Sequence, residues 1–161
     1  MSTETAFATR SEQEDWFPIL VLAIQEVFEI MLGCQVKPEA LSKLKLPHGE
    51  YTAMVGLAGA LCGVLTVCCN TKTAGGIAKS MLGDTPESEE QVADALGEIC
   101  NMIAGNFKNK LAGTDERCML SVPSVITGGE YVFRSLADGT CLETVLLFEE
   151  APVLVRLQLH S

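Results

Sequence analysis

The sequence is poor in basic residues and in histidine. Lysine and arginine number 11 against 21 acidic residues, and the formal net charge is −10. In most acidic proteins such a charge serves only solubility, but it also repels nucleic acid and anionic lipid and favours basic partner surfaces. We therefore expect neither nucleic acid nor a membrane as a partner. The two histidines, His48 and His160, do not lie near a cysteine pair, so no metal site is expected.

No CxxC pair occurs among the seven cysteines, and no secretory signal opens the chain, where residues 1–15 are mostly polar and acidic. An odd number of cysteines without this spacing argues against a disulfide framework. We expect reduced, buried thiols and a cytoplasmic protein.

A stretch without charge, Ala53–Cys69, is shorter than the roughly 20 residues that a membrane-spanning helix requires. Three glycines interrupt it, and its β-branched residues favour strand. We interpret it as part of two buried strands, 50–57 and 61–69, that turn near Ala58–Ala60.

What is present indicates one domain of the α+β class. Of the 161 residues, 48% are hydrophobic and 20% charged, enough for a real core. Periodicity and capping residues predict the elements. The expected helices span 15–32, 73–82 and 88–111, and the further expected strands span 118–122, 131–137, 141–148 and 152–160. We expect a disordered tail over residues 1–13 and a single domain over residues 14–161, with an antiparallel sheet carrying the helices on one face.

Capping residues set the helix boundaries. Asp15 is expected to cap the first helix, with Pro18 in its first turn and Gly33 as its stop. Gly83 is expected to close the second helix, and Ser88 and Gln91 predict a capping box at the start of the long helix.

On the long helix, five residues share one narrow stripe. With Asp94 at zero and about 100° per residue, Glu98 falls near about +40° and Asn101 near about −20°. Gly105 falls near about +20° and Lys108 near about −40°, whereas apolar residues occupy the opposite face. Asp94, Glu98 and Asn101 thus form a polar ridge aimed at solvent, with a glycine gap beside it.

Most polar stripes merely solvate a surface helix. Asn101 and Gly105 argue for more, because asparagine is a poor helix-interior residue and glycine costs about 1 kcal/mol relative to alanine. Local rules broken on an exposed face are a hint of function. Asn106 lies inside the apolar face, and we expect it to be a satisfied buried amide that holds the helix to neighbouring backbone.

The ridge has no nucleophile paired with a base, and Thr73–Ala78 lacks the glycine-lysine-serine arrangement of a phosphate-binding loop. An amide can donate to and accept from a water, and so align that water for in-line attack on a phosphoryl group. A neighbouring carboxylate can dock to a lysine of the partner. Such a protein would supply positioning, while the partner supplies the phosphoryl group and the metal.

The pattern Asp94-x3-Glu98-x2-Asn101, followed after 21 residues by Pro123, resembles the signature of the CheC/CheX/FliY chemotaxis phosphatases. The local sequence GEICNMIAGN, over Gly97–Asn106, is most similar to the CheX branch.

The resemblance implies a CheC-like fold and a phosphatase that acts on the phospho-aspartate of a CheY-like response regulator. Asn101 would orient the attacking water, and Glu98 would pair with a lysine beside the phosphorylated aspartate. Asp94 and Pro123 would support this geometry, together with the gap at Gly105. Magnesium would be bound by the partner, and no cofactor by this chain.

The chain also shows a trace of an internal repeat. EVFEIMLG, over Glu26–Gly33, parallels Glu98–Gly105 at an offset of 72 residues. Glu29 stands where Asn101 would be, and a carboxylate cannot donate to water and would repel a phosphoryl group. We therefore expect one site per chain, although two amphipathic helices can share these residues by chance.

Other functions stay open at this point. Flagellar switch components resemble this family in fold and bind partners without catalysis, so the main alternative is a non-catalytic module that binds a receiver or the flagellar switch. A third possibility is an adaptor that binds the phosphorylated receiver but hydrolyses slowly. The intact pair of Glu98 and Asn101 favours the enzyme.

The C-terminal strands predict self-association. The segment from Tyr131 to His160 is rich in apolar residues and has few charges to protect a sheet edge, which tends to pair with another chain. We expect a homodimer through these strands, and CheX proteins are similar in forming dimers.

Overall fold

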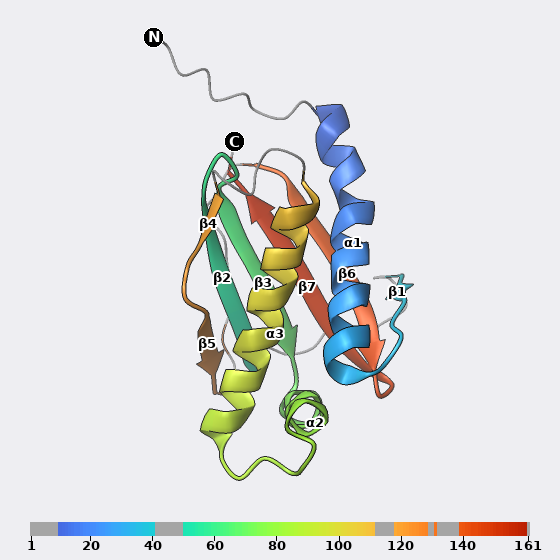
Figure 1. Cartoon of the computed structure of the whole chain (residues 1–161), viewed down its shortest axis with the longest axis vertical. Coiled ribbons are helices and arrows are strands. Elements are labelled where there is room, and N and C mark those ends of the chain that lie inside the picture. Colours follow the sequence, from blue (N-terminus) through green and yellow to red (C-terminus); the bar gives the residue numbers. More distant parts are fainter. Residues whose placement is uncertain (1–9, 41–49, 112–117, 129–130, 132–138, 161) are drawn as a thin grey trace.

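In the described part of the chain, an antiparallel sheet carries two long helices on one of its faces and a shorter helix at one end (Figure 1). The computed structural model describes residues 10–40, 50–111, 118–128, 131 and 139–160. The strand order is β1-β6-β7-β3-β2-β4, and β5 pairs with β2 beside β4. The strands are β1 (Pro38–Glu39), β2 (Tyr51–Gly59), β3 (Gly63–Cys69), β4 (Cys118–Leu120), β5 (Ser124–Thr127), β6 (Cys141–Phe148) and β7 (Ala151–Leu159). The predicted α+β class is confirmed.

The uncharged stretch of the sequence forms the β2–β3 hairpin at the centre of the sheet. Val55 pairs with Leu65 and Ala53 with Val67, and all four side chains are buried. The hairpin was predicted, but β2 continues to Gly59, so the turn comes slightly later than expected. No described helix is long and apolar enough to cross a membrane.

β6 and β7 confirm the strands predicted at 141–148 and 152–160, and the two pair as a hairpin. In β7 the alternating residues Val153, Val155 and Leu157 are fully buried, as expected of a strand that covers a core. The two-residue turn consists of Glu149 and Glu150, both with positive φ, as a tight hairpin with matching twist requires.

Helix α1 (Arg10–Leu32) begins earlier than predicted. Asp15 was expected to cap it, but the helix starts five residues before, within the segment expected as tail. Glu12, Gln13 and Glu14, directly before Asp15, are good helix formers, so a start before Asp15 costs little. Pro18 therefore lies inside the helix rather than in its first turn. Residues 1–9 lie outside the described part of the chain.

Helix α2 (Thr71–Leu82) ends and helix α3 (Glu89–Lys110) begins at a predicted cap, but α2 begins two residues earlier than predicted, where the Asn70 side chain accepts from the Thr73 amide. Gly83 ends α2 with φ 74°, the left-handed conformation that favours glycine. The Ser88 hydroxyl accepts from the Gln91 amide at 3.2 Å at the start of α3. The Gln91 side chain returns to the amide of Glu87, one residue before the cap.

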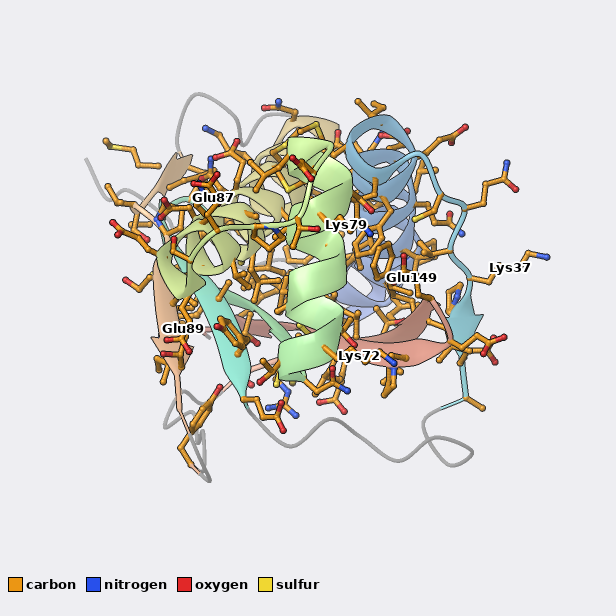
Figure 2. The ribbon with its side chains drawn as sticks, turned by 90° about the horizontal axis from the view of Figure 1, so that it is seen from below. Lys37, Lys72, Lys79, Glu87, Glu89 and Glu149 are labelled. Carbon is orange, nitrogen blue, oxygen red and sulfur yellow. The ribbon has the colours of Figure 1, made fainter. Side chains whose placement is uncertain are left out.

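Helix α2 packs across one end of the sheet, next to the β6–β7 turn. Figure 2 shows Glu149 of this turn beside α2. A Cβ added at Gly76 would lie 3.3 Å from Phe148 Cε1 and 2.9 Å from Glu149 Oε2, so α2 lies directly against this turn.

Two short strands were not predicted, and one strand is shorter than expected. β1 has two residues and begins with proline, and the exposed β5 has four, so neither has a clear alternating pattern. β4 ends at Leu120 instead of residue 122, because the connection to β5 contains Pro123, which has no amide hydrogen for a ladder. The strand predicted at 131–137 lies, apart from Tyr131, outside the described residues.

The core lies between the sheet and helices α1 and α3, which pack against each other. Phe28 of α1 and Phe107 of α3 are almost completely buried. Trp16 meets Phe107 edge to face, with ring centroids 6.5 Å apart. This packing leaves the opposite side of α3 free to carry the polar ridge.

Candidate functional site

The predicted ridge lies on the outer face of α3. Asp94 and Glu98 are exposed, and Asn101 and Gly105 are partly exposed. The apolar face of the helix is buried against the sheet and α1, through residues that include Leu96, Ile99, Cys100, Ile103, Ala104 and Phe107. The burial pattern therefore agrees with the helical wheel of the sequence.

Neither Glu98 nor Asn101 has a side-chain hydrogen bond or ion pair within the described part of the chain. The same holds for Asp94. Two carboxylates and one amide thus stand on a rigid helix whose other face is anchored in the core. Such groups can enter a partner without first breaking internal contacts of this kind.

Pro123, distant in sequence, is brought to this helix by a close contact at Gly97. A Cβ added at Gly97 would lie 3.4 Å from Pro123 Cβ and 3.4 Å from Val125 Cγ2. Gly97 lies one turn before Asn101, so the β4–β5 segment packs directly along the flank of the ridge. Sequence reasoning missed Gly97, although a glycine inside a helix is a signal of close packing or function.

Gly105, one turn after Asn101, has no comparable contact. The nearest atom to an added Cβ would be Leu120 Cδ1 at 3.8 Å, an ordinary van der Waals distance. The fold around Gly105 therefore accommodates a larger residue, and the glycine leaves space on the outer surface beside Asn101.

Ser121 fixes the connection between β4 and β5. Its hydroxyl accepts from the Gly56 amide at 2.8 Å, and its own amide donates to the Gly56 carbonyl at 2.9 Å. Pro123 thus lies two residues after a serine that is joined to Gly56 of β2 by two hydrogen bonds. Sequence reasoning did not single out Ser121, and a lone serine in a loop carries no signal for this role.

The first half of the apparent repeat, Glu26–Gly33, has a different role. Glu26 Oε2 lies 2.8 Å from Lys110 Nζ and accepts from Asn106 Nδ2, also at 2.8 Å. Asn106 Nδ2 also lies 3.3 Å from the Ala23 carbonyl, which confirms the expected amide link to neighbouring backbone. These hydrogen bonds, first from Lys110 and then from Asn106, lower the pKa of Glu26. Glu26, which matches Glu98 in the repeat, therefore joins α1 to α3.

The cysteines only partly match the expectation of buried thiols. All seven are free, but Cys62 and Cys141 are exposed. Burial raises the pKa of Cys69 and of Cys100 to about 12, so these two thiols stay protonated near neutral pH. Within the described residues, no group of three or more histidine, cysteine, aspartate or glutamate side chains could hold a metal ion.

The fold is CheC-like. A CheC-like superfamily protein from a Shewanella species is similar in structure, with a TM-score of 0.77, 23% identity and coverage of 91% of this chain and 98% of that one. At this identity the likeness concerns the fold.

The chain belongs to the CheX family. Residues 51–146, more than half of the chain, match the family model described as chemotaxis phosphatase CheX. The CheY-P phosphatase CheX of Thermotoga maritima is 26% identical over 121 residues, which cover 72% of this chain and 77% of that protein. The CheX of Borrelia burgdorferi, solved in complex with CheY, BeF3 and Mg, is 26% identical, with a TM-score of 0.75 and coverage of 91% of this chain and 99% of that one.

Proposed function

We propose that this protein hydrolyses the phospho-aspartate of a CheY-like receiver domain, with α3 as the element that enters the receiver's active site. The observation that carries the proposal is the pair of Glu98 and Asn101, both accessible and without internal side-chain partners in the described chain, on the outer face of an anchored helix. The names of the relatives from Thermotoga and Borrelia support the same partner and reaction.

Asn101 is the residue that positions the attacking water. Its carbonyl oxygen accepts one hydrogen bond from the water, and its amide nitrogen can donate to the same water or to a phosphoryl oxygen. The water oxygen forms a bond to phosphorus as the bond from phosphorus to the aspartate oxygen breaks. The products are inorganic phosphate and a free carboxylate. Holding the water in line removes the entropic cost of finding this geometry.

Glu98 orients the complex. About one helical turn separates it from Asn101, so both side chains reach the same opening of a partner. A lysine beside the phosphorylated aspartate would pair with the Glu98 carboxylate and fix the rotation of α3 in the opening. The charge of −10 on the whole chain adds attraction toward such a basic rim.

The remaining residues of the site either support α3 or leave space for the partner beside Asn101. Pro123 supports α3 at Gly97, and Gly105 leaves room for the partner's surface next to Asn101. Asp94 extends the acidic ridge by one turn. Magnesium, in this proposal, is bound by the receiver and offsets the charge of the phosphoryl group there. A cytoplasmic location is part of the proposal and agrees with the free thiols of this chain.

The proposal also includes a homodimer through the C-terminal strands. β7 lies inside the sheet between β6 and β3, so of these two strands only β6 has an edge to offer. Among the described residues, only Val145 and Leu146 of that edge pair with β1. An edge of this kind tends to pair with another strand.

Phosphate release from purified phospho-CheY tests the proposal against its alternative. With catalytic amounts of this protein and Mg²⁺ present, phosphate release should exceed the spontaneous rate and scale with protein concentration. A binding module would instead bind CheY activated with beryllofluoride and leave the rate of phosphate release unchanged. That second outcome would overturn the enzymatic role and leave the docking role in place.

A further inference from the structure

Exposed apolar side chains gather at the sheet edge that flanks the ridge. Met119 is 76% exposed, Val122 83% and Ile126 39%, although all three lie in or between β4 and β5. No charged residue occurs between Cys118 and Gly128. Charged residues make up 20% of the chain. An uncharged and exposed strip next to a candidate site is therefore a candidate contact surface.

The register shows that two of these side chains point away from α3. Met119 pairs with Ala58, and it follows the buried Cys118 and precedes Leu120, which reaches Gly105 of α3. Because side chains alternate along a strand, Met119 projects from the opposite face of the sheet. Ile126 likewise follows Val125, whose Cγ2 approaches Gly97, and so it also projects from the opposite face.

Val122 differs from both, because it lies in the unpaired connection between the strands. Leu120 contacts the helix at Gly105, and Pro123 contacts it at Gly97. Asn101 is the helix residue midway between these two glycines. The short connection through Val122 therefore passes the helix at the level of Asn101.

The helical wheel places Asn101 on the side of α3 that faces this connection. Gly97 falls near about −60°, Asn101 near about −20° and Gly105 near about +20° on the same scale as before. The two glycines have no side chain that could stand between Asn101 and the connection through Val122. A partner that receives Asn101 in its active site must therefore also approach Val122.

We infer that Val122 is an apolar docking contact for the receiver domain, beside the polar contacts of Asn101 and Glu98; this rests on the proposed function. The partner surface that fits is apolar and lies on the rim of the receiver's active site, on the side away from the lysine that Glu98 would meet. Val122 supplies binding, and Asn101 supplies positioning of the water. Changes at Val122 should therefore alter affinity and KM, whereas the rate at saturation should stay near that of the wild type.

The test compares Val122→Asp and Val122→Ala with Met119→Asp as matched control. Met119 lies three residues away, is similarly exposed and receives the same change of charge, but it faces the other side of the sheet. The measurement is the Kd for CheY activated with beryllofluoride and Mg²⁺, by calorimetry, together with KM and kcat for phosphate release. Thermal unfolding checks that each variant is folded.

We expect Val122→Asp to weaken binding by at least about tenfold and Val122→Ala by about threefold, the range expected for loss of one buried aliphatic contact. Met119→Asp should bind within about twofold of the wild type, as is usual for a surface change outside the interface. Equal affinities of the Val122 variants and the wild type would overturn the inference, and so would equal weakening by Val122→Asp and Met119→Asp. Failure of the wild type to bind CheY at all would instead overturn the proposed function.

Discussion

Gly97 and Gly105 lie four residues before and four residues after Asn101. The two positions have different structural surroundings. Gly97 is buried at a packing contact, where an added Cβ would already lie 3.4 Å from both Pro123 and Val125, so the fold leaves room there for little more than a methyl group. Gly105 meets only Leu120, at an ordinary distance. A glycine that weakens a helix without an internal reason is best explained by the approach of a partner.

Gly105→Ala separates stability from function at this position. Alanine removes the conformational cost of glycine in a helix and finds space, so the free energy of unfolding should rise by about 0.5–1 kcal/mol. The added methyl group narrows the gap beside Asn101, so KM for phospho-CheY should rise. Chemical denaturation and steady-state kinetics measure the two effects. A more stable variant with unchanged KM would show that the gap does not serve the partner.

Glu98→Gln tests the proposed ion pair. The substitution keeps the shape of the side chain and removes its charge, so association with activated CheY should weaken. The remaining affinity should depend less on salt than that of the wild type, because one screened charge pair has been lost. Titrations at low and high ionic strength measure this. Unchanged affinity and salt dependence would identify Glu98 as an ordinary solvated surface carboxylate.

At the scale of the elements, the sequence predicts correctly those features that depend on a few neighbouring residues. The caps at Ser88 and Gly83 are properties of a few adjacent residues, and both were predicted correctly. The helical face of Asp94, Glu98 and Asn101 followed from periodicity alone. The long central strands were recognised for the same reason, since each combines β-branched residues with a continuous or alternating apolar pattern.

What could not be predicted depends on contacts between distant segments. β5 exists because β2 offers it an edge after Pro123 interrupts β4, and nothing in Ser124–Thr127 itself requires a strand. Pro123 packs on α3 at Gly97, which lies 26 residues earlier. The first turns of α1 were missed because Asp15 is a good cap residue, while the preceding residues are equally good helix formers.

The contacts of Glu26 on α1 with Lys110 and Asn106 on α3 should make the stability of the protein depend on pH. The pKa of Glu26 is lowered in the folded protein by Lys110 and Asn106, so its carboxylate stabilises the fold above the pKa of an unfolded glutamate, near about 4.3. This contribution is lost as pH falls through the lower, folded pKa. Glu26→Gln should therefore show a weaker loss of stability than the wild type on acidification below about pH 5.

Thermal unfolding from neutral to acidic pH measures this difference. Glu29→Gln is the matched control, because Glu29 lies on the same helix and is exposed. The two variants should differ in the slope of stability against pH. Identical slopes for Glu26→Gln and the wild type would show that the contacts with Lys110 and Asn106 do not stabilise the folded state.

At the scale of the whole molecule, the proposed dimer interface and the proposed site lie at opposite edges of the sheet. β6 lies toward one edge, whereas α3 packs over β2 and β5 at the other (Figure 1). Pairing through β6 would leave both ridges accessible, so a dimer should bind two receivers independently.

Light scattering at micromolar concentrations should give twice the mass of the 17.2 kDa chain. Calorimetry should give one receiver per chain without cooperativity. A mass of a single chain across this range would contradict the dimer. An interface that covers Asp94–Gly105 would contradict the mechanism as well, because no receiver could then reach Asn101.

The account as a whole rests on Asn101 as the group that positions the attacking water. The most direct test is phosphate release from phospho-CheY by Asn101→Ala, compared with the wild type and with Asn109→Ala. Asn109 is an exposed asparagine on the same helix, two turns beyond the site. Asn101→Ala should lower kcat by about two to three orders of magnitude, as loss of a group that acts in the transition state does, with little change in stability. Asn109→Ala should retain wild-type activity. A folded Asn101→Ala variant that releases phosphate at the wild-type rate would contradict the account.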